Sequence, residues 1–180
     1  MISSDMHSVK HPNEYLITSL DAFFSEGDLI DTMLKIVRNE TMSLRTLDWF
    51  VTNYSKKNNT MFTTPDGKLF NVFLEYKAQL KSYSKRMFDP FNRGERIMFK
   101  DKKGNEFSTT VGQLNFFRWV LKHDIVSQCM KCIDDVESDM LASTRMRKAS
   151  SSPNDKRREL SKAAIKKCMN ISTKVTIRFD

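Results

Sequence analysis

Residues 70–93, FNVFLEYKAQLKSYSKRMFDPFNR, combine aromatic side chains with several Lys and Arg residues. The apolar residues recur at the spacing of one helix face, namely at Phe73, Tyr76, Leu80, Tyr83 and Met87. Asp89-Pro90 ends this pattern, because the residue before a proline is disfavoured in helical geometry. We interpret the apolar face as core and the other face as a basic surface. That basic surface is either simply solvated or binds nucleic acid or an acidic protein.

Positive charge is concentrated in two parts of the chain. The net charge is +8 over 180 residues, and it comes from residues 61–100 (+4) and 141–180 (+8), while 1–60 and 101–140 carry −2 each. Such asymmetry indicates an anionic partner for the two basic parts. The candidate partner-binding or nucleic-acid-binding residues are Lys77, Lys81, Lys85, Arg86, Arg93, Arg145, Arg147, Lys148, Lys156, Arg157, Arg158, Lys162, Lys166 and Lys167.

The predicted fold class is α+β: a helix-rich single domain with short antiparallel β-hairpins and a basic C-terminal extension. We expect residues 1–141 to form the core, with helices at 13–25, 28–39, from Ser43 onward, 111–123 and 125–141. Turn residues at Pro65-Asp66-Gly67 and Asp101–Gly104 predict two hairpins, each followed by a helix. Residues 142–180 are predicted to be a basic linker to 155, a helix over 156–169 and a final strand over 173–179.

Motifs for catalysis or for metal binding are weak in this sequence. Cys129 and Cys132 form a lone CxxC pair, and a zinc site would need two further ligands such as His123 and Cys168. We therefore predict structural thiols, no metal, no cofactor and no catalytic residues. An acidic stretch is interpreted as a solvated helix surface rather than a metal site, and it contains Asp134, Asp135, Glu137 and Asp139.

Several aromatic residues could stack on nucleic-acid bases, but their helical spacing favours core packing. They are Trp49, Phe50, Phe116, Phe117 and Trp119. No apolar run is long enough to span a membrane, and the N-terminus lacks the apolar segment of a signal peptide.

A resemblance to a known family rests on several short segments. They are TLDWFVTNY at 46–54, EYKAQL at 75–80, YSK at 83–85, FDPF at 88–91 with Arg93, GQLNFFRW at 112–119 and RRELS at 157–161. Together they resemble a family of small, uncharacterised proteins of nucleocytoplasmic large DNA viruses. The resemblance implies a viral context and a place in the particle or in its assembly, and it supplies no catalytic residues.

The leading functional hypothesis is a non-enzymatic virion or assembly component, a basic adaptor that contacts acidic capsid protein or packaged viral DNA. The alternative is a nucleic-acid-binding factor in viral replication or transcription. The expected location is the virion and the host cytoplasm. The oligomeric state is not determined by the sequence.

Overall fold

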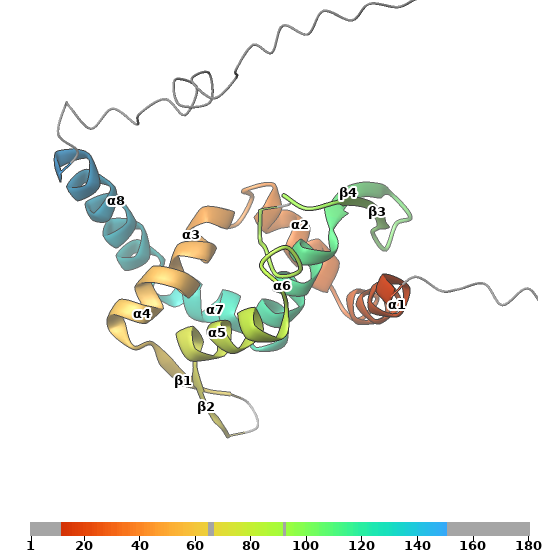
Figure 1. The fold of residues 1–180 in the computed structure, drawn as a ribbon, viewed down its shortest axis with the longest axis horizontal. Helices are drawn as coiled ribbons and strands as arrows, with labels where there is room; N and C mark the ends of the chain where they lie inside the picture. Colours follow the sequence, from red (N-terminus) through yellow and green to blue (C-terminus); the bar gives the residue numbers. More distant parts are fainter. Residues whose placement is uncertain (1–11, 65–66, 92, 151–180) are drawn as a thin grey trace, which may run out of the picture. The chain divides into compact units, whose positions relative to one another are not determined.

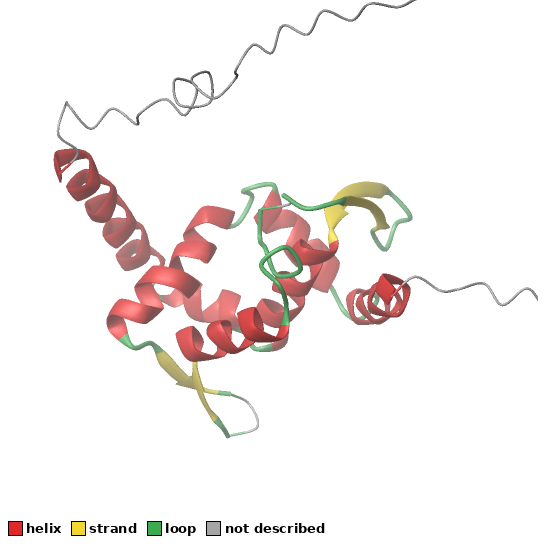
Figure 2. Cartoon of the chain, viewed as in Figure 1, coloured by secondary structure: helices red, strands yellow, loops and turns green. Residues whose placement is uncertain are grey.

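The computed structural model describes residues 12–64, 67–91 and 93–150, and the chain divides into two units, Met1–Met140 and Leu141–Asp180. The first unit is built mainly from helices with two separate two-stranded sheets, so the predicted α+β class is confirmed (Figures 1 and 2). The helix predicted over 156–169 and the strand predicted over 173–179 lie outside the described residues.

The N-terminal part is helical, as the sequence predicts. Its elements are α1 (Pro12–Phe24), α2 (Leu29–Val37), α3 (Leu44–Trp49), the π-helical turn η1 (Phe50–Tyr54) and α4 (Ser55–Asn58). Ser43 caps α3, because its side-chain oxygen accepts hydrogen bonds from the backbone N–H groups of Arg45 and Thr46. The helix predicted over 13–25 begins at Pro12, a residue well suited to a first helical position, so Asn13 lies inside the helix and does not cap it.

Both predicted hairpins are present. Strands β1 (Met61–Thr63) and β2 (Leu69–Asn71) pair antiparallel, and so do β3 (Arg96–Lys100) and β4 (Glu106–Thr110). The turn glycines Gly67 and Gly104 adopt φ values of +80° and +81°, the left-handed region that glycine tolerates without steric cost. Each hairpin leads directly into a helix, which confirms the predicted hairpin-plus-helix order.

Helix α5 (Val72–Ser82) is shorter than its apolar pattern predicts. Asn71 caps its start, but Tyr83 is extended at φ −112° and ψ 143°, so Met87 lies beyond the helix. The segment after it is held elsewhere: the N–H of Asp89 donates to the carbonyl of Gly112 at 3.1 Å. The helix therefore ends several residues before Asp89-Pro90, the stop that the sequence predicts.

Helix α6 (Val111–Lys122) is the centre of the core. Thr110 caps it, and every residue from Val111 to Phe117 is buried. The helix contacts α1, helix α7 (Ile125–Lys131) and β4. The predicted core positions of Phe50, Phe116, Phe117 and Trp119 are confirmed, and Trp49 is half-buried.

The single helix predicted over 125–141 is wrong. The backbone breaks at Cys132 (φ −130°, ψ 30°), between α7 and helix α8 (Ile133–Ser150). The linker predicted from 142 is also wrong up to residue 150, because α8 continues to Ser150. Extending an existing helix through Ala, Arg, Met and Lys costs little, since nucleation has already occurred.

The acidic residues at the start of α8 are not all solvated. Asp139 accepts a hydrogen bond from the indole N–H of Trp49 at 2.9 Å and pairs with Lys57. Glu137 accepts a hydrogen bond from Thr46 at 3.3 Å. These contacts attach the first turns of α8 to α3 and α4. The interpretation of a solvated acidic face is thereby corrected for Asp139, whereas Glu137 is exposed.

Candidate functional site

The predicted basic surface includes a row of side chains along α5. Phe73, which was expected on the apolar core face, is half-buried and is not among the side chains that pack against the core. Phe73, Lys77 and Lys81 are spaced four residues apart, so they share one helix face, which we call the α5 row. The ammonium nitrogens of Lys77 and of Lys56 in α4 each lie 5.8 Å from the centroid of the Phe73 ring. This distance permits cation–π attraction on both lysines. The α5 row therefore combines charge with an aromatic ring.

Four cations of this region have no ionic partner among the described residues. Lys77, Lys81, Lys85 and Arg86 are exposed, and none forms an ion pair with another described residue. Lys85 and Arg86 lie after the end of α5, within the segment that packs near the start of α6. Exposed cations without an internal counter-charge remain available to an external anion.

Arg93 differs from the other predicted residues of this region. Its guanidinium donates to both carboxylate oxygens of Asp89, at 2.9 Å from Nε and 2.6 Å from Nη2. This bidentate bond holds the pKa of Asp89 below its usual range. Asp48, Asp89 and Arg93 line a small cavity of about 310 Å³. Burial raises the pKa of Asp48 to about 6, although the positive charge of Arg93 lowers it.

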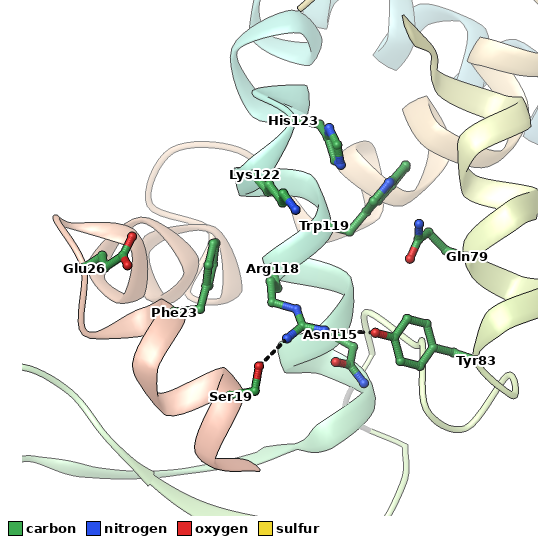
Figure 3. Close-up of a pocket in the computed structure, with 10 residues that line it drawn as sticks. All are labelled: Ser19, Phe23, Glu26, Gln79, Tyr83, Asn115, Arg118, Trp119, Lys122 and His123. Atoms are coloured by element: carbon green, nitrogen blue, oxygen red, sulfur yellow. Dashed lines mark hydrogen bonds between the residues drawn. The ribbon is translucent and has the colours of Figure 1, made fainter. Parts of the chain in front are cut away.

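A larger cavity, of about 670 Å³, lies between α1, α5 and α6, and sequence reasoning missed it. We call it the Arg118 cavity (Figure 3). Its walls carry Ser19, Phe23, Glu26, Gln79, Tyr83, Asn115, Arg118, Trp119, Lys122 and His123. These residues are far apart in the sequence and share no motif, so only the packing of three helices brings them together.

Arg118 joins the three walls of this cavity. Its Nη1 donates to the hydroxyl of Ser19 on α1 at 3.2 Å, and its Nη2 donates to the hydroxyl of Tyr83 after α5 at 2.9 Å (Figure 3). Among the described residues no carboxylate pairs with Arg118. The guanidinium is thus held in place by the neutral hydroxyls of Ser19 and Tyr83.

The walls are also tied together beneath the surface. The amide nitrogen of Asn115 donates to the carbonyl of Met87 at 2.9 Å, and the side-chain amide of Gln113 donates to the carbonyl of Pro90 at 2.8 Å. Both side chains belong to buried residues of α6. These bonds fix the segment after α5 against α6, and hence the position of Tyr83 relative to Arg118.

The second group of predicted cations lies mostly outside the described residues. Arg145 and Arg147 are exposed on α8, and for Lys148 only the helical backbone is described. The remaining six are not described: Lys156, Arg157, Arg158, Lys162, Lys166 and Lys167. Their role in binding stays a prediction.

The buried member of the CxxC pair is Cys129. Cys129 is fully buried in α7, and burial raises the pKa of its thiol to about 12, which suppresses the reactive thiolate. In the described ranges, no three His, Cys, Asp or Glu side chains come close enough together to hold a metal ion. None of the described helices has the length and apolar character required to cross a bilayer.

The fold and its exposed cations define a basic, helix-rich α+β protein. Residues 5–177 match the model of a family of unknown function, DUF7197, and the chain belongs to that family. It is similar to "Uncharacterized protein L507" of Acanthamoeba polyphaga mimivirus, with 39% identity over 158 residues, or 82% of this chain. The match spans 61% of the length of that relative. A viral protein family is thus supported, and no solved structure matches the chain.

Proposed function

We propose that this protein is a non-enzymatic component of a large DNA virus, a basic adaptor in the virion or in its assembly. It binds an acidic surface, either capsid protein or packaged DNA, through the α5 row and the basic C-terminal segment. The observation that carries the proposal is the set of exposed cations, Lys77, Lys81, Lys85 and Arg86, that lack counter-charges among the described residues.

The contrast with Arg93 supports this role. Arg93 is bound to Asp89 within the fold, so its charge contributes to the structure of the 88–93 segment. Lys77 and Lys81 make no such bond and are exposed, whereas the half-buried Tyr76 contacts the rings of Phe88 and Trp119. Charge placed without an internal partner is suited to an external one.

The proposal includes no catalytic step, and it places the protein in the virion and in the host cytoplasm. The viral relative is consistent with this context. The buried, high-pKa thiol of Cys129 is suited to packing rather than to nucleophilic chemistry.

A second candidate is a nucleic-acid-binding factor in viral replication or transcription. The observation that favours it is Phe73, whose ring centroid lies 5.8 Å from the ammonium nitrogens of Lys56 and Lys77. Proteins that bind single strands combine aromatic rings, on which bases stack, with cations that contact phosphates.

The test is binding of duplex and single-stranded DNA by the full chain over a range of salt concentrations. We compare the wild type with Lys77→Gln/Lys81→Gln and with a charge-matched control, Lys35→Gln/Lys103→Gln, which changes exposed lysines on α2 and in the β3–β4 turn. If DNA is the partner, the α5 variant loses about two units of the salt slope, because each lost phosphate contact removes about one. The control should bind almost as the wild type does, apart from a small non-specific effect of net charge.

Mass spectrometry of purified particles separates the two candidates. Packaging of the protein in stoichiometric amounts supports the adaptor, and its recovery only from infected cytoplasm supports the replication or transcription factor. Equal binding and packaging of the α5 variant and the wild type would contradict a role for the α5 row. The C-terminal cations would then be the candidate binding residues.

A further inference from the structure

We propose that the Arg118 cavity binds a small phosphate monoester attached to a ring, the chemistry of a nucleoside monophosphate. This is a small-molecule site on the side of α5 that faces α1 and α6, and it is independent of the α5 row. It therefore goes beyond the proposed adaptor function. The argument rests on the hydrogen-bond donors, the charge and the rings that line the cavity.

The donors in the cavity exceed its own acceptors. A guanidinium has five N–H donors, and Arg118 uses one for Ser19 and one for Tyr83, which leaves three without a partner among the described residues. The Ser19 and Tyr83 hydroxyls accept from Arg118, so their own hydrogens are available for donation. A ligand that suits this set must carry several acceptor oxygens, and a terminal phosphate carries three.

The charge of the cavity favours the same ligand. Lys122 is exposed at its edge and forms no ion pair or hydrogen bond with a described residue. Together with Arg118 it outweighs Glu26, the carboxylate among the lining residues. A doubly charged phosphate monoester gains more from two cations than a singly charged carboxylate does.

The rest of the wall is suited to a ring. Phe23 from α1 and Trp119 from α6 line the cavity together with the imidazole of His123 (Figure 3). A volume of about 670 Å³ is within the range of cavities that hold small organic ligands. Trp119 is buried against other rings and His123 stacks on Phe70, so the half-buried ring of Phe23 is the one that can stack on a heterocyclic base. Inorganic phosphate cannot make this contact.

The test is isothermal titration calorimetry of the full chain with adenosine 5′-monophosphate, adenosine and inorganic phosphate as probes. We expect the monophosphate to bind at least about tenfold more tightly than either of the others, since each of its two parts contributes contacts. Lys122→Gln and Arg118→Lys should each weaken monophosphate binding by about tenfold, while adenosine binding changes little.

Lys35→Gln on α2 is the matched control, because it removes one exposed positive charge away from the cavity. It should bind the monophosphate as the wild type does. Equal affinities for adenosine and adenosine monophosphate would overturn the phosphate site, and equal affinities for inorganic phosphate and the monophosphate would overturn the ring site. Unchanged binding in Lys122→Gln and in Arg118→Lys would overturn the proposal entirely.

The proposed adaptor function and the proposed phosphate site are tested by different variants, so either proposal can be refuted without the other. Lys77→Gln/Lys81→Gln should leave monophosphate binding unchanged, and Lys122→Gln should leave DNA binding and packaging nearly unchanged. Lys122 is exposed and without a partner among the described residues, so its variant should fold normally, and loss of binding reports on the cavity.

Discussion

Helices α5 and α6 have similar sequence patterns, since both follow a hairpin and both contain aromatic residues at helical spacing. The two helices nevertheless differ in burial. In α5 only Val72 is buried, whereas in α6 every residue from Val111 to Phe117 is buried. The stretch that carries the clearest apolar and basic faces is thus peripheral, and a helix with polar Gln113 and Asn115 is central. Apolar spacing predicts a helix, but it does not rank helices by burial.

The strongest test of this difference is the same substitution made in each helix. Leu114 is fully buried in α6, and Leu74 is 63% exposed in α5. Leu114→Ala should lower the free energy of unfolding by about 2–5 kcal/mol, because it leaves a cavity in the core. Leu74→Ala should change it by less than about 0.5 kcal/mol. Urea unfolding measures both, and similar losses in the two variants would contradict the assigned burial.

A second test concerns the close approach of α6 to the segment after α5. A Cβ added at Gly112 would lie 2.4 Å from the carbonyl oxygen of Arg86, so Gly112→Ala must displace backbone. We expect a loss of about 1–3 kcal/mol from overpacking. Gly94→Ala is the control, since its Cβ would lie 3.7 Å from the same oxygen, an ordinary contact. A Gly112→Ala protein as stable as Gly94→Ala in thermal unfolding would show that the two segments pack more loosely.

A third test asks whether polar residues hold α6 in place. Gln113 donates to the carbonyl of Pro90 and accepts from the hydroxyl of Thr109 at 2.9 Å, both in buried surroundings. Gln113→Met keeps the approximate shape and leaves both partners unsatisfied, so we expect a loss of about 1–2 kcal/mol. Hydrogen exchange should show faster opening of the segment after α5, and unchanged protection there would rule out this anchoring role.

The smallest expected effect depends on pH and concerns Asp48 on α3. The pKa of Asp48 is raised to about 6 by burial, so the folded state binds its proton more tightly than the unfolded state does. Stability contributed by this group is therefore lost as pH rises from about 4 to about 6. Asp48→Asn removes that loss and should gain about 1 kcal/mol at pH 8 relative to wild type, but almost nothing at pH 4. Melting temperatures at the two pH values check this, and a gain that is equal at both would contradict a titrating Asp48.

Local signals determined much of the fold. Ser43 and Thr110 cap helices because their side-chain oxygens accept backbone hydrogen bonds, and Gly67 and Gly104 form turns because they tolerate positive φ. The exposed cations of α5 could also be predicted, because their spacing separates them from Tyr76 and Leu80, although Phe73 shares the face of Lys77 and Lys81. The viral family could be inferred from short segments before any comparison, and the family match covers them.

Other features required the tertiary structure, because they depend on residues distant in sequence. The end of α5, the break at Cys132 and the extension of α8 to Ser150 could not be located from local pattern. Arg93 and Lys77 are both basic residues of one stretch, but only the folded chain shows that Asp89 binds Arg93. The Arg118 cavity is the clearest case, since Ser19, Tyr83 and Arg118 meet only when α1, α5 and α6 pack together. Local sequence determines backbone preference over a few residues, whereas cavities and charge pairing arise from long-range packing, which one sequence does not specify by pattern alone.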